Sequence, residues 1–181
     1  NRMWAPAPVW RTGQEASYWF GDDGDERFGL VWPAPRFVES GDCVIDRLTG
    51  LMWAKNARLA GSALGWTDAM AYAGSLSLCG YRDWKLPNRK ELRSLADYSQ
   101  SGPALPAGHP FSGVMTHYWT STTTGSTDQA WVMNMGNGTF AAPSYSKYAT
   151  YDAWPVRNTL TGPGPGTQYA LTVGKSGPGS G

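Results

Sequence analysis

The spacing of apolar residues in the middle of the chain predicts two helices. The first is expected to begin at Thr67, whose hydroxyl can cap free backbone amides, with Asp68 in its first turn. Cys79-Gly80 is expected to end it. Residues three and four positions apart then share one apolar face, which consists of Ala69, Met70, Ala73 and Leu76.

The second helix is marked by a capping signal. Asn88 precedes Glu91 by three residues, so the side chain of each can bond the backbone amide of the other at the start of a helix. Gly102-Pro103 prevents that helix from continuing further. Its buried stripe is expected to consist of Leu92, Leu95 and Ala96.

Strands are expected on both sides of the helices. Two short ones are predicted at residues 43–46 and 51–54, with a turn at Thr49-Gly50 between them. From residue 118 onward the pattern is again typical of strands. A sheet segment with one ring-bearing face is predicted because Ala130, Val132 and Asn134 alternate with Trp131, Met133 and Met135.

The last part of this region contains a turn and a short strand. Asn137-Gly138 is typical of a tight hairpin turn. A final strand is expected over residues 153–157, where Pro155 fits an edge position or a strand end. These patterns predict that the chain contains both helices and short strands.

The two ends of the chain lack such periods. Residues 1–40 are expected to form an extended arm whose rings dock onto the core, and these include Trp4, Trp10, Trp19 and Trp32. Ten of the 24 residues in 158–181 are Gly or Pro, which predicts a linker. The expected organisation is therefore one domain over 1–157, including the arm, and a linker over 158–181.

Composition excludes several classes of protein. The 181 residues carry 15 basic and 14 acidic side chains, a net charge of +1, so nothing indicates a nucleic-acid partner. No apolar run approaches the roughly 18 residues of a membrane span, so membrane insertion is not expected. Only 16% of residues are charged, against about 25% in average proteins. Ten Trp, nine Tyr and 23 Gly favour a loop-rich fold pinned by large rings.

Few residues are candidates for catalysis or metal binding. The two cysteines, Cys43 and Cys79, are either a disulfide or two buried thiols. His109 and His117 lack further ligands at zinc spacing, so no metal site is assigned. The acidic run over 21–25 could offer oxygens to calcium, but it lacks the twelve-residue loop and bidentate Glu of an EF-hand. No cofactor is expected, and no nucleophile with an activating base is present.

The strongest binding signal is the segment over residues 136–152. It is polar, small and tyrosine-bearing, as adaptable binding loops are, although an ordinary loop with partly buried rings has the same composition. Because it lacks Leu, Ile, Val and Met, its rings are expected to be substantially exposed. The candidate ligand-binding residues are Thr122, Thr124, Phe140, Ser144, Tyr145, Tyr148, Tyr151 and Asp152. Five tryptophans are expected in the core, namely Trp53, Trp84, Trp119, Trp131 and Trp154.

Six motifs in a fixed order carry a resemblance to a known family. They are GDDGD at 21–25, WPAPRF at 32–37, LTGLMW at 48–53, DWKLPNRKEL at 83–92, YWTST at 118–122 and WPVR at 154–157. In this order they resemble the Lcl-type domain at the C-terminus of bacterial collagen-like adhesins. That family in turn resembles the C-type-lectin-like fold of formylglycine-generating enzymes. This resemblance implies an α+β fold, with two helices packed on a twisted antiparallel sheet and long irregular loops.

The resemblance shapes the functional hypothesis. It implies an extracellular or cell-surface module, in which Cys43 and Cys79 would pair, and the strand-like residues 169–173 resemble the start of a surface-protein β-repeat. Formylglycine-generating enzymes use two reactive cysteines near the C-terminus, and no cysteine follows Cys79 here. We therefore expect a non-enzymatic module that binds a protein or glycan on another surface. A structural or oligomerising module, including a homo-oligomer, is the alternative, and an oxidative enzyme is disfavoured.

Some Lcl-like domains also resemble the variable proteins of diversity-generating retroelements. Randomising the first two bases of AAY codons never yields Met, Trp, Gln, Lys or Glu. Within residues 136–152 only Lys147 belongs to that set, whereas Gln129, Trp131, Met133 and Met135 lie just upstream as a candidate fixed framework. The segment over 136–152 is thus a candidate hypervariable loop.

Overall fold

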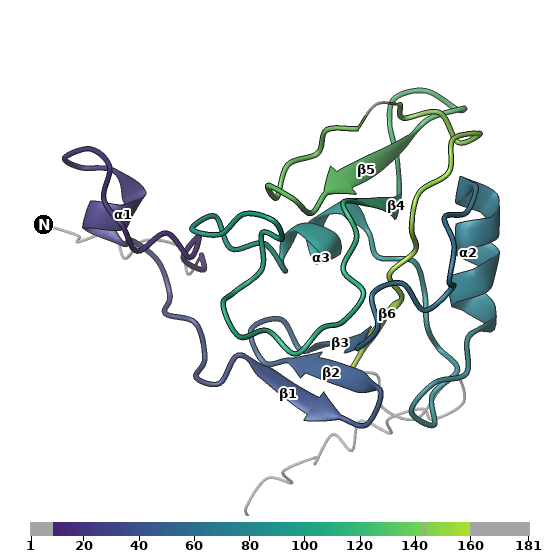
Figure 1. Ribbon diagram of the computed structural model, residues 1–181, viewed down its shortest axis with the longest axis horizontal. Coiled ribbons are helices and arrows are strands. Elements are labelled where there is room, and N and C mark those ends of the chain that lie inside the picture. Colours follow the sequence, from purple (N-terminus) through teal and green to yellow (C-terminus); the bar gives the residue numbers. More distant parts are fainter. Residues whose placement is uncertain (1–8, 143, 160–181) are drawn as a thin grey trace, which may run out of the picture.

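Two antiparallel sheets and two main helices form the body of the protein in the computed structural model, which describes residues 9–142 and 144–159 (Figure 1). The larger sheet has the strand order β1-β2-β3-β6, and the smaller one pairs β4 with β5. The strands are β1 (Phe37–Ser40), β2 (Cys43–Asp46), β3 (Leu51–Ala54), β4 (His117–Thr123), β5 (Ala130–Asn134) and β6 (Val156–Asn158). The helices are α1 (Asp23–Glu26), α2 (Trp66–Ser75) and α3 (Arg89–Arg93). The α+β prediction is confirmed.

The small sheet is buried on both faces, because a hydrophobic cluster lies on each side of it. On one side Tyr118 and Met133 pack with α3 and the four-stranded sheet, where Trp53 and Trp154 meet edge to face at 5.7 Å. On the other side Trp119 packs against the small residues of α2. Strands β4 and β5 therefore connect the two halves of the core, and the loops that follow β5 are held by them.

The predicted disulfide is present. Cys43 in β2 bonds Cys79, which follows α2 and lies 36 residues later in the chain. Trp84 packs in the same small cluster, and its indole N–H donates to the Leu78 carbonyl. The bridge thus ties the large sheet to the segment between the two main helices.

Helix α3 follows its sequence signal closely. The Asn88 side chain accepts hydrogen bonds from the amides of Lys90 and Glu91 at 2.9 Å, and the Glu91 carboxylate accepts one from the Asn88 amide at 2.8 Å. The stripe at 92, 95 and 96 is buried, although the regular helix ends at Arg93. The capping box is confirmed.

Helix α2 differs from expectation at both ends. It begins at Trp66 after Gly65, so Thr67 is not its cap, and it ends at Ser75, before Cys79. Met70 is 38% exposed instead of buried. The reason is Trp66, whose indole N–H donates to the Thr120 carbonyl at 2.8 Å and turns the helix so that Ala69 and Ala73 face inward.

The strand predictions at 43–46 and 51–54 are confirmed, and the turn at Asn137-Gly138 closes with a bond from the Gly138 amide to the Asn134 carbonyl at 2.9 Å. The last strand begins later than expected, at Val156, and forms an edge of the large sheet directly after Pro155. Of the predicted linker, residues 160–181 lie outside the described part of the chain, as does Trp4 of the arm.

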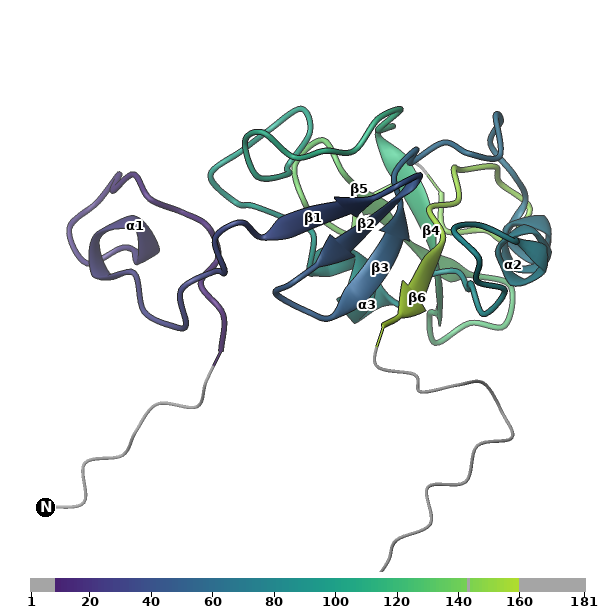
Figure 2. The same cartoon turned by 90° about the horizontal axis from the view of Figure 1, so that it is seen from below.

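The expectation that the rings of the arm dock onto the core is wrong for most of them. Trp32 is half-buried, but Trp10 and Trp19 are exposed. Residues 9–35 instead fold on themselves around α1, and Figure 2 shows α1 on the side of the sheet away from α2. The unit contacts the body where the Tyr98 amide donates to the Thr12 carbonyl at 3.1 Å. We call residues 9–35 the N-terminal unit.

Candidate ligand-binding site

Four side chains at the outer edge of β5 form an open cluster of rings around a cation. The Arg89 guanidinium lies 4.0 Å from the centre of the Trp131 ring and 4.5 Å from that of Phe140. Trp131 also meets the Tyr145 ring edge to face at 5.3 Å. We call Arg89, Trp131, Phe140 and Tyr145 the aromatic cluster.

Three different elements position this cluster. The capping box makes Arg89 the first residue of α3, and its amide donates to the Thr122 hydroxyl of β4 at 3.0 Å. Trp131 belongs to β5. Phe140 and Tyr145 follow the hairpin turn, and the Tyr145 hydroxyl donates to the Phe140 carbonyl at 2.8 Å. Because β4, β5 and α3 are all anchored in the core, the cluster has a rigid base.

Arg89 differs electrostatically from other half-buried or buried arginines of the protein. Arg36 pairs with Asp46 at 3.0 Å, and Arg157 pairs with Asp83 at 2.7 Å. Within the described residues, the Arg89 guanidinium has neither a carboxylate partner nor a hydrogen bond. Stacking on two ring faces orients it without using its N–H donors, which therefore stay available to a ligand.

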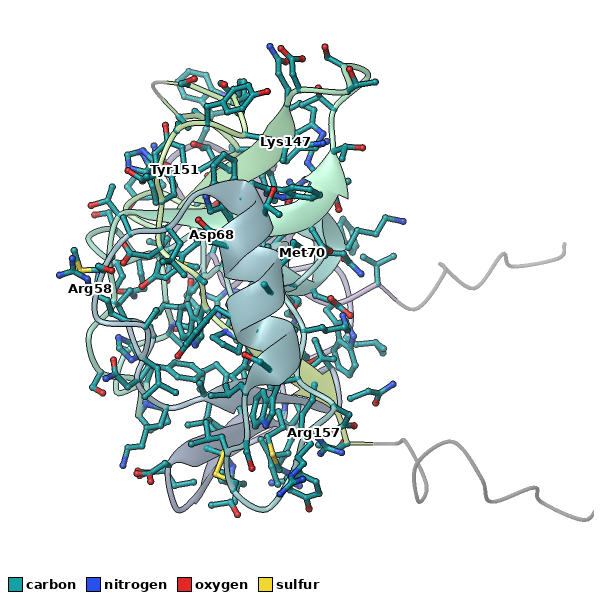
Figure 3. All side chains as sticks on the ribbon, turned by 90° about the vertical axis from the view of Figure 1, so that its right-hand side faces the viewer. Arg58, Asp68, Met70, Lys147, Tyr151 and Arg157 are labelled. Carbon is teal, nitrogen blue, oxygen red and sulfur yellow. A yellow bond between two sulfur atoms is a disulfide. The ribbon has the colours of Figure 1, made fainter. Side chains whose placement is uncertain are left out.

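A second pairing of a cation and a ring lies close by. The Lys147 ammonium lies 4.3 Å from the centre of the Trp66 ring and donates to the Thr127 carbonyl at 2.7 Å. Figure 3 shows Lys147 beyond the N-terminal end of α2. Tyr148, the next residue, is 89% exposed. Of the four rings that were expected to be exposed, only that of Tyr148 is exposed.

The exposure expected for the other rings is wrong. Phe140 and Tyr145 are half-buried, because they pack on Trp131. Tyr151 is half-buried because it packs edge to face on Trp119 at 4.9 Å. Its hydroxyl donates to the Ser144 carbonyl at 2.9 Å and accepts from the Ser144 amide at 3.1 Å. Tyr151 and Ser144 thus stabilise the loop from within.

Asp152 is buried and does not lie on the surface of the candidate site. Its carboxylate accepts from Arg58 at 3.2 Å, and its backbone bonds both His117 and Trp119. Burial raises the pKa of Asp152 above its ordinary value, while the ion pair with Arg58 opposes that shift. Figure 3 places Arg58 and Tyr151 on the same side of α2. We assign Asp152 a structural role.

The two threonines of the candidate set have different roles. Thr122 supports Arg89 directly, as described above. The Thr124 hydroxyl bonds Gln129 at 3.3 Å and accepts from the Ser126 amide at 3.1 Å, so it closes the turn between β4 and β5. The structure therefore brings Thr122, Phe140 and Tyr145 together and leaves the others at separate positions.

Sequence reasoning missed the two central members of the cluster. Trp131 was expected in the core with Trp53, Trp84, Trp119 and Trp154, and those four are buried, but Trp131 is half-buried. It shares a face of β5 with Met133 yet lies beyond the end of the core. Arg89 was not singled out, although the capping box fixes it at the start of α3 and so carried a usable signal.

Metal binding finds no support in the described residues. No group of three or more His, Cys, Asp or Glu side chains is arranged to hold an ion there. The Asp22 carboxylate of the acidic run accepts hydrogen bonds from the amides of Tyr18 at 2.8 Å and Asp25 at 3.0 Å. These bonds, led by that of Tyr18, lower the pKa of Asp22. The acidic run thus caps α1.

Comparison with known proteins identifies the family. No curated protein matches the chain. Residues 42–157, more than half of the 181-residue chain, match the Lcl C-terminal domain. This match indicates a surface- or adhesin-associated module with a secreted or surface location, which the disulfide fits. None of the described helices is long and apolar enough to cross a bilayer. The chain belongs to the Lcl C-terminal domain family.

Proposed function

We propose that this protein is a non-enzymatic binding module that recognises a protein or glycan ligand through the aromatic cluster. The observation that carries the proposal is the Arg89 guanidinium, held on two ring faces with its donors unused within the described residues. A guanidinium in this arrangement suits a planar oxyanion, such as a carboxylate, next to an apolar surface. Such a group occurs on acidic side chains and on acidic sugars.

The neighbouring side chains extend this surface. Lys147 supplies a second cation on a ring, and Tyr148 supplies an exposed ring beside it. Tyr and Trp contribute large contact areas with little loss of conformational entropy, since each has only two side-chain torsions. The ligand is therefore expected to carry negative charge at two points with apolar surface near each.

A C-type-lectin-like fold is part of the proposal. Its support is the combination of two helices with antiparallel sheets and long loops, together with the family resemblance of the motifs. The enzymatic alternative has little support, because the two cysteines of the chain are bonded to each other. Oxidation of a substrate by the route of formylglycine-generating enzymes needs a reactive thiol.

Hypervariability of residues 136–152 is a separate element of the proposal. Tyr148 is the kind of exposed position that can vary freely, whereas Tyr145 and Tyr151 pack inward and tolerate fewer replacements. The coding region decides this point. A nearby near-repeat that differs only at adenines, beside a reverse transcriptase gene, is expected if the loop is diversified.

A binding experiment with matched variants tests the main proposal. Arg89→Met keeps the stem of the side chain and removes its charge, and Lys90→Met makes the same kind of change at an exposed neighbour on α3 with no ring contact. The probe is an array of neutral, carboxylated and sulfated oligosaccharides together with acidic and basic peptides. We expect the native chain to bind acidic probes, Arg89→Met to bind them at least about tenfold more weakly, and Lys90→Met to bind normally. Equal binding by the native chain and Arg89→Met, or no binding of the native chain to any acidic probe, would contradict the proposal.

A further inference from the structure

Most of the exposed large apolar side chains among the described residues belong to the N-terminal unit. In the described part of the chain, eight of the fourteen such side chains with high exposure belong to residues 9–31. Within this unit three consecutive rings are the most exposed, Tyr18 at 82%, Trp19 at 80% and Phe20 at 92%, and Phe28 follows at 73%. We call these four side chains the ring tip.

The ring tip is exposed because the inside of the unit is polar. The Asp22 carboxylate accepts from the amides of Tyr18 at 2.8 Å and Trp19 at 3.2 Å, which holds the loop around a charged centre. Gly24 is buried so closely that a Cβ there would lie 2.0 Å from the Ala16 carbonyl oxygen. This tight packing leaves little space around α1, and the rings of residues 18–20 and 28 lie on the outside.

The exposed area is large enough to form an interface. At about 150–250 Å² per aromatic side chain, the ring tip exposes on the order of 600 Å². The largest apolar patch of a typical monomer is roughly 300–600 Å², and a stable interface buries about 800 Å² on each partner. The unit therefore has the apolar area of one side of a stable contact.

A matching apolar trough lies along the open edge of the large sheet. It has a volume of about 530 Å³ and runs between β1 and the loop over 106–110. Among the residues that the structure describes, β1 pairs with β2 alone, so its other edge has no partner strand there. The side chains that give the trough its apolar character are Pro35, Phe37, Val38, Pro106, Ala107 and Pro110.

The charges of the two surfaces fit each other. Helix α1, which lies between residues 20 and 28 of the ring tip in the sequence, carries the acidic residues Asp23, Asp25 and Glu26 and is followed by Arg27. Glu39, the one carboxylate lining the trough, is paired with Lys55. Arg47 bonds the Pro35 carbonyl at the end of the trough and has no carboxylate partner among the described residues. A contact between two ring tips would bring two acidic helices together, which disfavours it.

We propose that the ring tip of one copy of this chain docks into the β1 trough of a second copy. The contact is head to tail, since the two surfaces are different, and each bound copy leaves one tip and one trough open. Association through it therefore continues beyond the dimer unless the chain of copies closes into a ring. The contact involves none of the aromatic cluster, so it stands independently of the proposed ligand binding.

Sedimentation and light scattering of the full 181-residue chain test this contact with two interface variants. Trp19→Ser/Phe20→Ser removes two rings of the tip, and Val38→Asp places a charge in the trough. We expect the mean mass of the native chain to rise with concentration, and each variant to lower the association constant at least about tenfold. A mixture of the two variants retains one intact tip and one intact trough, so it should form a dimer and no larger species.

Two controls distinguish this contact from non-specific association and from misfolding of the variants. Tyr148→Ser, which removes an exposed ring elsewhere, should associate like the native chain. Unchanged circular dichroism and melting temperature should show that both interface variants are folded. A native chain that stays monomeric at its highest soluble concentration would overturn the proposal, and its ring tip would then belong to a different partner. Continued self-association of Val38→Asp would overturn it as well, because the tip would then dock elsewhere.

Discussion

Most aromatic side chains are buried or half-buried in the family-matched body but exposed to solvent in the N-terminal unit. In the body, Trp119 and Trp154 are fully buried, and each indole N–H donates to a backbone carbonyl at 2.8–2.9 Å. In the N-terminal unit, Trp19 and Phe20 are among the most exposed side chains described. Phe, Trp and Tyr make up six of the 27 residues in the N-terminal unit and 15 of the 116 residues in the family-matched body. The region richer in rings is thus the one that exposes most of them, so ring content does not explain burial.

The two regions differ in whether regular secondary structure provides apolar faces on which rings can pack. In the body, strands and a helix with regular apolar positions provide faces against which rings pack, and the ladders satisfy the backbone polar groups. The N-terminal unit has only the four-residue α1, and the Asp22 carboxylate accepts from three of its backbone amides, those of residues 18, 19 and 25. A loop with a polar centre must carry its apolar side chains outside.

The largest expected effect is that of removing a ring from the body. Trp84 is 3% exposed and packs beside the disulfide, so Trp84→Ala leaves a cavity that its neighbours cannot fill. We expect a loss of about 3–5 kcal/mol in the free energy of unfolding, as for other large-to-small core changes. Denaturant unfolding measures it. A melting temperature within a degree or two of the native value would contradict the description of this region as core.

The disulfide should have the next largest effect. Replacing both cysteines by alanine releases a loop of 36 residues in the unfolded chain, which corresponds to roughly 3–4 kcal/mol by the loop-entropy account. The free energy of unfolding of Cys43→Ala/Cys79→Ala should fall by about that amount, while the N-terminal unit, which lies outside the loop, keeps its local structure. Two reactive thiols in denatured, unreduced native protein would show instead that the bridge does not form.

The sequence allowed good predictions wherever a signal was local. The capping box at Asn88, the strands at 43–46 and 51–54 and the Cys43–Cys79 pair all follow from a few neighbouring residues or one family resemblance. Helix α2 begins one residue earlier than predicted, because Thr67 is a good cap by residue type but the half-buried Trp66, whose indole bonds the Thr120 carbonyl, starts the helix. Tertiary packing overrode the local preference there.

The site was predicted less well, because exposure depends on long-range contacts. Composition correctly indicated that the loop over 136–152 has few apolar side chains to bury besides its rings. Two of those rings nevertheless pack on distant tryptophans, Tyr151 on Trp119 and Tyr145 on Trp131. Arg89 gained its importance only when α3 brought it over two rings. The inward-folded acidic centre of the N-terminal unit likewise rests on bonds of Asp22 that no periodicity reveals.

A smaller effect is expected from a histidine that lines the β1 trough. Burial lowers the pKa of His109 below its ordinary value of 6.5, so the folded protein favours the neutral ring and the unfolded chain binds more protons in mild acid. The stability that this group contributes is present above about pH 6.5 and is lost as the pH falls through the folded pKa. His109→Gln has no group at this position that titrates in this pH range. Its melting temperature should therefore decline less than that of the native chain between about pH 7 and pH 5, and parallel curves would contradict this assignment.

The smallest effect is expected from removing a ring of the N-terminal unit, and it gives the sharpest comparison with Trp84. Trp19→Ala makes the same chemical change as Trp84→Ala, but 80% of the Trp19 side chain already contacts solvent. Because little apolar surface leaves water when this ring folds, its loss should change the free energy of unfolding of dilute protein by no more than about 0.5 kcal/mol. Dilution is essential, since association through the ring tip would add stability that depends on concentration. A loss above about 1 kcal/mol at low concentration would mean that Trp19 packs within its own chain, and the contrast between the two regions would not hold.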